Sequence, residues 1–125
     1  MMNQKTLLSI IELGGYPDFS AIYQAAGYAV LTEYSLRKAI KTIKASKPDV
    51  IVAEFNFQSD FRDRSSNLES ILAAAESKGG SRIIVFYELE HETAFQRFAS
   101  QHTLAATLHF PIDTEHLANV INALE

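Results

Sequence analysis

The stretch Pro48-Asp49-Val50-Ile51-Val52-Ala53-Glu54-Phe55 decides the fold of this chain. It passes from a proline that ends a helix, through a short apolar run, to a single carboxylate. Such a run is typical of a parallel strand that is covered on both faces. Open α/β sheets place their functional sites at the carboxyl ends of these strands. Glu54 is therefore the first candidate site residue.

Four further apolar runs have the same character, and segments with helical spacing separate them. Strands are expected at 6–11, 28–32, 50–53, 82–87 and 105–110. Helices are expected at 19–26, 35–47, 67–78, 91–102 and 114–124, with Thr114 as the cap of the last one. Strands that alternate with helices predict a parallel sheet with helices on both sides.

Composition limits the classes of function. The 125 residues fit one domain, with a formal net charge of −4 and no cysteine. The charge disfavours nucleic acid and anionic membranes as partners. The missing thiols exclude disulfides and cysteine-based zinc sites. No leader or membrane-spanning stretch is recognisable, so we expect a cytoplasmic protein.

Three stretches resemble the response-regulator receiver domains of the CheY-like superfamily, and the resemblance covers nearly the whole chain. They are Ala26-Gly27-Tyr28-Ala29-Val30, Lys47 through Glu54, and Ala105 through Asp113 with its Pro111. The resemblance implies a three-layer α/β/α, flavodoxin-like fold with a doubly wound five-stranded parallel sheet of order 2-1-3-4-5. It also implies a cis peptide before Pro111. Separately, the length leads us to expect a single domain over 1–125, and because the last expected helix runs to the end of the sequence, we expect no output domain.

The same resemblance places the residues of a receiver's phosphorylation site. The phosphoacceptor position holds Glu54 in place of aspartate, and only Glu12 remains of the acidic pair that holds Mg²⁺. The Thr/Ser position holds Tyr87, and Phe110 stands where a lysine is expected before Pro111. These departures predict a pseudo-receiver that has lost phosphotransfer: a non-enzyme without metal or cofactor.

Three of these positions allow more than one interpretation. Glu54 could be a fixed mimic of a phosphorylated aspartate, or a solvated acid without a role. Glu12 and Glu54 could share a hard cation such as Mg²⁺ or Ca²⁺, although a second acid beside Glu12 is missing. Tyr87 could act as a switch or docking residue on an aromatic lip formed with Phe86, or be a half-buried tyrosine with a satisfied hydroxyl.

Three surfaces are candidates for a protein partner. Phe55, Phe57 and Phe61 predict an exposed hydrophobic patch, with folding back over the next helix as the alternative. The fourth helix, fifth strand and fifth helix are a second surface, which could also form a homodimer by analogy with receivers. The third is a basic stripe on the second helix, interpreted as a solvated face or as a dock for an acidic protein; its residues are Arg37, Lys38, Lys41, Lys44 and Lys47.

We therefore expect a signalling or scaffold module that binds a protein partner. An atypical receiver, phosphorylated on a non-standard acid such as Asp60 or Asp63, is the first alternative. A small-ligand sensor that uses a cleft between the first and third strands is the second.

Overall fold

A computed structural model describes residues 4–56 and 66–124. Its five strands form one sheet in the order β2-β1-β3-β4-β5, and every neighbouring pair is parallel. The strands are β1 (Lys5–Ile10), β2 (Tyr28–Glu33), β3 (Val50–Glu54), β4 (Arg82–Tyr87) and β5 (Ala106–His109). The predicted fold class and strand order are confirmed.

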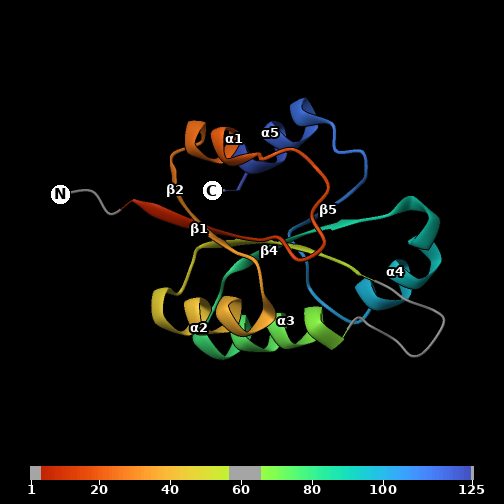
Figure 1. Cartoon of the computed structure of the whole chain (residues 1–125), viewed down its shortest axis with the longest axis horizontal. Coiled ribbons are helices and arrows are strands. Elements are labelled where there is room, and N and C mark those ends of the chain that lie inside the picture. The colour runs from red at the N-terminus through yellow and green to blue at the C-terminus, as the bar shows by residue number, and fades with distance from the viewer. Residues whose placement is uncertain (1–3, 57–65, 125) are drawn as a thin grey trace.

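Helices cover both faces of the sheet (Figure 1). One face carries α1 (Ser20–Ala25) and α5 (Thr114–Asn122). The other carries α2 (Leu36–Ser46), α3 (Ser66–Lys78) and α4 (Glu92–Ala99), and a 3₁₀ turn, η1 (Leu89–His91), precedes α4. The predicted helix at 91–102 thus ends earlier, at Ala99, and a 3₁₀ turn precedes it.

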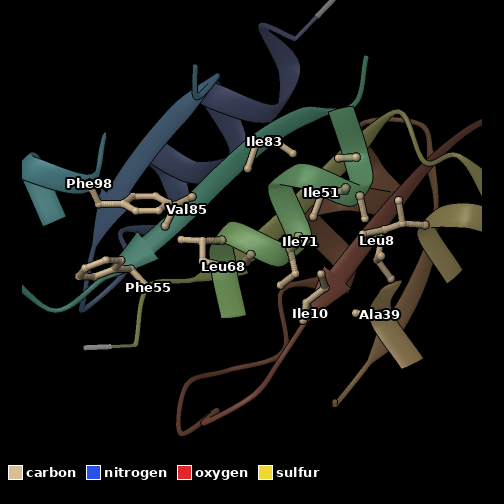
Figure 2. Close-up of a cluster of buried hydrophobic side chains, with 14 of the residues drawn as sticks. Leu8, Ile10, Ala39, Ile51, Phe55, Leu68, Ile71, Ile83, Val85 and Phe98 are labelled. Carbon is tan, nitrogen blue, oxygen red and sulfur yellow. The ribbon is translucent and has the colours of Figure 1, made fainter. Parts of the chain in front are cut away.

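Each face of the sheet has its own hydrophobic cluster. The first joins β1, β3 and β4 to α2, α3 and α4, and Figure 2 shows its side chains interleaved between sheet and helices. The second joins the opposite faces of the same strands to α1 and α5. β3 contributes to both clusters because all five of its residues are buried, as its apolar run predicts.

Side-chain caps fix the beginnings of two helices. The Ser35 hydroxyl accepts a hydrogen bond from the Lys38 N–H at 3.3 Å, so α2 begins where the sequence predicts. The prediction that Thr114 caps the last helix is wrong by one residue. The Asp113 carboxylate accepts from the N–H groups of Glu115 and His116, and it caps α5 instead.

Candidate functional site

Glu54 ends β3 in the middle of the sheet, beside the end of β1. Ser9 of β1 lies opposite Val52 of β3, so Glu54 is level with the start of the loop between β1 and α1. Only 4% of Glu54 is exposed to solvent. The interpretation of Glu54 as a solvated acid is therefore wrong. Its side chain, one methylene longer than that of aspartate, turns inward against this loop.

Five donors surround the Glu54 carboxylate. Three are consecutive backbone N–H groups of the β1–α1 loop: Leu13 donates to Oε1 at 2.9 Å, and Glu12 and Gly14 donate to Oε2 at 3.3 and 3.4 Å. The Tyr16 hydroxyl donates to Oε2 at 2.6 Å, and the Asn56 amide donates to Oε1 at 3.4 Å. A buried carboxylate requires such a set of partners, since burial without hydrogen bonds costs several kcal/mol.

Two glycines let the loop wrap around this carboxylate. Gly14 and Gly15 have φ angles of 70° and 82°, which lie in the left-handed region that favours glycine. Successive N–H groups in a loop of this kind form a concave site that binds anions. In this chain, the anion is a side chain of the same molecule.

The Glu12 side chain points to α3, although the backbone N–H of Glu12 is one of the donors to Glu54. Its Oε2 accepts from the Asn67 amide at 3.1 Å. Burial raises the pKa of the Glu12 carboxyl above its ordinary value of 4.5; the bond from Asn67 lowers it in part, and the charge of Glu54 raises it. Within residues 4–56 and 66–124, no group of three or more His, Asp and Glu residues is placed to hold a metal ion.

Tyr16 joins the carboxylate to an aromatic layer on the α1 and α5 side of the sheet. Its ring packs against Phe110 with a centroid distance of 5.1 Å, against Phe86 at 5.8 Å and against Phe19 at 5.9 Å. Burial, followed by the hydrogen bond to Glu54, raises the pKa of the Tyr16 hydroxyl, so it remains a donor. Phe110, at the expected lysine position, thus supports this donor with its ring.

Tyr87 lies on the other side of the sheet and forms no aromatic lip with Phe86. Phe86 is buried among residues of the α1 and α5 side. The Tyr87 ring is buried too, 6% exposed, and it stacks on Phe95 of α4 at 4.2 Å with an interplanar angle of 14°. Burial, and then the charge of Glu92, raises the pKa of the Tyr87 hydroxyl. Both rings therefore belong to the core and not to an exposed rim.

The predicted hydrophobic patch fails at Phe55, because this side chain is 3% exposed. Its ring packs against Phe95 at 5.1 Å and Phe98 at 5.5 Å, and Figure 2 shows it beside Phe98 at one end of the first cluster. The alternation of side chains along β3 places Phe55 on the α4 side. Phe57 and Phe61 lie outside the described residues.

Two other predicted features can be placed. The Phe110–Pro111 peptide bond is cis, as the resemblance predicts. A pocket of about 530 Å³ is present, but it lies where α3 and α4 end, at the edge where the strands begin. Its lining includes Glu76, Ser81 and His102. The space between the ends of β1 and β3, where a ligand cleft was predicted, holds the Glu54 side chain and its donors.

Sequence reasoning missed three residues of this site: Tyr16, Asn56 and Asn67. Tyr16 lies in the segment Gly14-Gly15-Tyr16-Pro17, whose glycines and proline predict a turn and give no sign of a site residue. A useful signal was the tyrosine itself, since a ring placed after two glycines can reach back over the strand ends.

No protein-family model matches the chain, and no curated protein matches it. Several solved structures match the chain. CheY4 of Vibrio cholerae, a chemotaxis response regulator, has a TM-score of 0.72 at 18% identity, over 98% of this chain and 100% of that one. A response regulator receiver domain protein from Clostridium thermocellum has a TM-score of 0.68 at 14% identity, over 95% of this chain and 93% of that one.

A third match is described as a novel family of redox sensors in the streptococci that evolved from two-component response regulators. Its TM-score is 0.70 at 16% identity, over 95% of this chain and 50% of that one. Together these matches show that the chain has the CheY-like fold of response-regulator receiver domains. In the part of the chain that the structure describes, every helix is too short or too polar to cross a membrane.

Proposed function

We propose that this chain is a non-phosphorylatable pseudo-receiver that works as a cytoplasmic signalling or scaffold module through protein–protein contacts. The receiver-domain fold supports a place in response-regulator signalling. The observation that carries the proposal is the Glu54 carboxylate, which is buried and accepts hydrogen bonds from the β1–α1 loop and Tyr16.

This arrangement disfavours phosphotransfer on three physical grounds. Both Glu54 oxygens already accept hydrogen bonds, so neither is free to attack a phosphodonor. Metal-assisted transfer needs oxygen ligands that converge on one ion, whereas Glu12 turns to Asn67. A cation that would neutralise the transferred group is replaced by the ring of Phe110.

The negative charge of Glu54 also resembles that of a phosphorylated aspartate, the product of phosphotransfer in a receiver. A carboxylate that permanently occupies a nest of N–H groups presents the protein with the negative charge that phosphorylation would add, although it lacks the three phosphoryl oxygens. We propose that Glu54 holds the domain in one fixed signalling state. The surfaces around α4, β5 and α5 then remain the candidates for partner binding or for a symmetric homodimer.

Intact-mass measurement tests the loss of phosphotransfer. The protein is incubated with Mg²⁺ and a small phosphodonor, beside a working receiver domain as the positive control. We expect no phosphoryl adduct on the wild type. We also expect none on Glu54→Asp, because this variant restores the acceptor but neither the lysine nor the acidic pair.

An adduct on the wild type would contradict the proposal and favour the atypical receiver. Its loss in Asp60→Ala or Asp63→Ala would identify the acceptor. The fixed state is tested separately by partner capture from the native cell with wild type, Glu54→Gln and Glu54→Ala, each checked for folding by circular dichroism. Equal capture by all three would remove any signalling role for the charge.

A further inference from the structure

The charge of this molecule is concentrated on one helix. The segment 36–47 holds five cations and no acid, whereas the other 113 residues hold six cations and 15 acids, a formal balance of −9. Arg37, Lys38, Lys41 and Lys44 project from one side of α2, opposite the buried Ala39 and Ile43. We call the four side chains, with Lys47 after them, the basic helix face.

Helix stability explains only Lys44 of this face, which lies in the last turn, where the helix dipole favours a cation. Arg37 and Lys38 lie in the first turn, where the positive end of the helix dipole repels cations, and no acid accompanies them. Lys41 has cationic neighbours three or four positions away in both directions, and such like-charge pairs destabilise a helix. Lys47 adopts a φ of 48°, a left-handed conformation in which glycine is the usual residue.

The cations of this face also lack ion pairs: among residues 4–56 and 66–124, no carboxylate forms an ion pair with any of the five. All five cations of the basic helix face are exposed. A surface that costs local stability and leaves its charges unpaired is typical of a binding surface rather than of a solvated helix face.

The same molecule carries a matching acidic surface between β4 and α4. Glu88, Glu90 and Glu92 are exposed there, around Leu89, whose exposure is 50%. The basic helix face has an apolar neighbour as well, because Tyr34, 69% exposed, directly precedes the helix cap. We call residues 88–92 the acidic segment.

The two surfaces are similar in length and opposite in charge. From Arg37 to Lys44 the helix rises about 10 Å, at 1.5 Å per residue. The acidic segment, which includes a 3₁₀ turn, spans on the order of 10 Å. Leu89 and Tyr34 provide an apolar contact for each side, as the anchor of an otherwise charged interface requires.

The position of the two surfaces excludes a contact within one molecule. Figure 1 shows α2 in the left half of the view and α4 at its right end, well apart along the longest axis of the molecule. A pairing must therefore join two copies, and because it uses different surfaces of each copy it is a head-to-tail contact. An extended polyanion such as nucleic acid fits less well, since it would be repelled by the −9 charge outside α2.

We propose that the basic helix face of one molecule docks on the acidic segment of a second molecule of this chain. The contact is salt-sensitive and repeats from copy to copy, and it is independent of the function proposed above. Tyr34 and Leu89 provide the apolar anchors, and the charges of the two surfaces set the orientation.

Sedimentation equilibrium of the full chain tests this proposal over a hundredfold range of protein concentration. We expect the average mass to rise above the 13.9 kDa of one chain in low salt. In about 0.5 M salt, where charges are screened within a few ångströms, the dissociation constant should rise at least about tenfold. A mass of one chain under all conditions, or association that salt leaves unchanged, would overturn the proposal.

Two charge reversals identify the surfaces. Lys41→Glu/Lys44→Glu and Glu88→Lys/Glu90→Lys should each remain single chains, because the first lowers the formal charge of the basic helix face from +5 to +1 and the second changes that of the acidic segment from −3 to +1. A mixture of the two variants should associate again, since the acidic segment of the first meets the basic helix face of the second. Failure of the mixture to associate, with both variants folded by circular dichroism, would overturn the proposal.

Two further variants serve as controls. Glu115→Lys reverses an exposed acid at the start of α5, on the other face of the sheet, and should leave association unchanged. Thr107→Glu places a charge at an exposed position of the edge strand β5 and would disrupt a symmetric dimer through α4, β5 and α5. If Thr107→Glu abolishes association while the two charge reversals preserve it, the head-to-tail contact is wrong.

Discussion

At the scale of the residue, Glu54 is a carboxylate in the protein interior, where burial disfavours a charged group. An ionised carboxylate at 4% exposure is stable only where its hydrogen bonds replace those of water. Hydrogen bonds to a charged group contribute about 1.5–3 kcal/mol each. Glu54 has five donors, and three of them come from one short loop. The carboxylate and the loop therefore stabilise each other.

Glu54→Gln keeps the shape of the side chain but replaces one acceptor oxygen with an NH₂ group. At least one loop N–H or the Tyr16 hydroxyl then faces a donor. We expect a loss of about 1–3 kcal/mol in the free energy of unfolding, measured by urea denaturation. The amides of Glu12, Leu13 and Gly14 should also exchange faster with solvent hydrogen.

Glu69→Gln is the matched control, because Glu69 is exposed on α3. The same chemical change there should alter the free energy of unfolding by no more than about 0.5 kcal/mol. An equally small effect at Glu54 would mean that the carboxylate does not hold the loop.

Glu12 gives the stability a dependence on pH. Its raised pKa means that the folded protein binds the Glu12 proton more tightly than the unfolded chain does. The stabilisation from this proton is present below the ordinary pKa of 4.5 and is lost as the pH rises through the raised value. Glu12→Gln stays neutral at every pH and can still accept from Asn67.

The free energy of unfolding of Glu12→Gln minus that of wild type should therefore grow as the pH rises above 4.5. Urea denaturation at a series of pH values measures this difference, and ordinary salt keeps the charges of distant groups from dominating it. A difference that stays constant, or that shrinks with rising pH, would contradict the raised pKa.

At the scale of the element, α2 begins with a favourable cap and ends with a strained residue. Ser35 satisfies the Lys38 N–H, which is the expected use of a serine before a helix. Lys47 ends the helix at a φ of 48°, where a Cβ crowds the backbone. The segment therefore combines a stabilising start with a destabilising end.

Two glycine substitutions in this segment should have opposite signs. Lys47→Gly relieves the left-handed strain and should raise the free energy of unfolding by up to about 1 kcal/mol. Lys44→Gly, within the exposed part of α2, should lower it by about 1 kcal/mol because glycine disfavours helix. Thermal denaturation compares the two variants with wild type. A destabilised Lys47→Gly would mean that the Lys47 side chain compensates for the strain.

The elements could be predicted from the sequence because each has a strong local pattern. β3 reads as a buried strand from its apolar run alone, and α3 from Leu68 and Ile71 on one side of a helix. The site was less predictable because its contacts join distant segments. Glu54 and Leu13 are 41 positions apart, and no local pattern shows that a strand-end acid will bind loop amides. Whether Phe55 is exposed or folds back was left open, because a residue directly after a strand resembles a loop residue until the packing of α4 is known.

At the scale of the whole molecule, one sheet links the two hydrophobic clusters. β3 and β4 bury side chains on both faces, so neither cluster can open without exposing the back of the other. A sheet shared in this way predicts a single cooperative unit. The expectation of one domain over 1–125 leads to the same test.

Ile71→Val and Ile121→Val remove one methyl group from the first and the second cluster, respectively. Each should lower the free energy of unfolding by about 0.5–1.5 kcal/mol. The double variant should lower it by the sum, because the two sites lie on opposite faces of the sheet and share no partner. For each variant, far-ultraviolet circular dichroism and tyrosine fluorescence should follow the same urea transition. Different transition midpoints for the two probes in any one variant would contradict a single cooperative unit.

The donors gathered around Glu54 also limit which residues this position can accept. A change of Glu54 to aspartate shortens the side chain by one methylene, and it withdraws the acceptor from loop amides and from Tyr16, which the fold now depends on. Each buried donor left unpaired costs about 1–3 kcal/mol, so one such change consumes much of the margin of a small domain. Aspartate at this position is therefore expected to be tolerated only together with changes in the loop or at Tyr16. The network around one carboxylate thus limits which sequences the chain can reach by single substitutions.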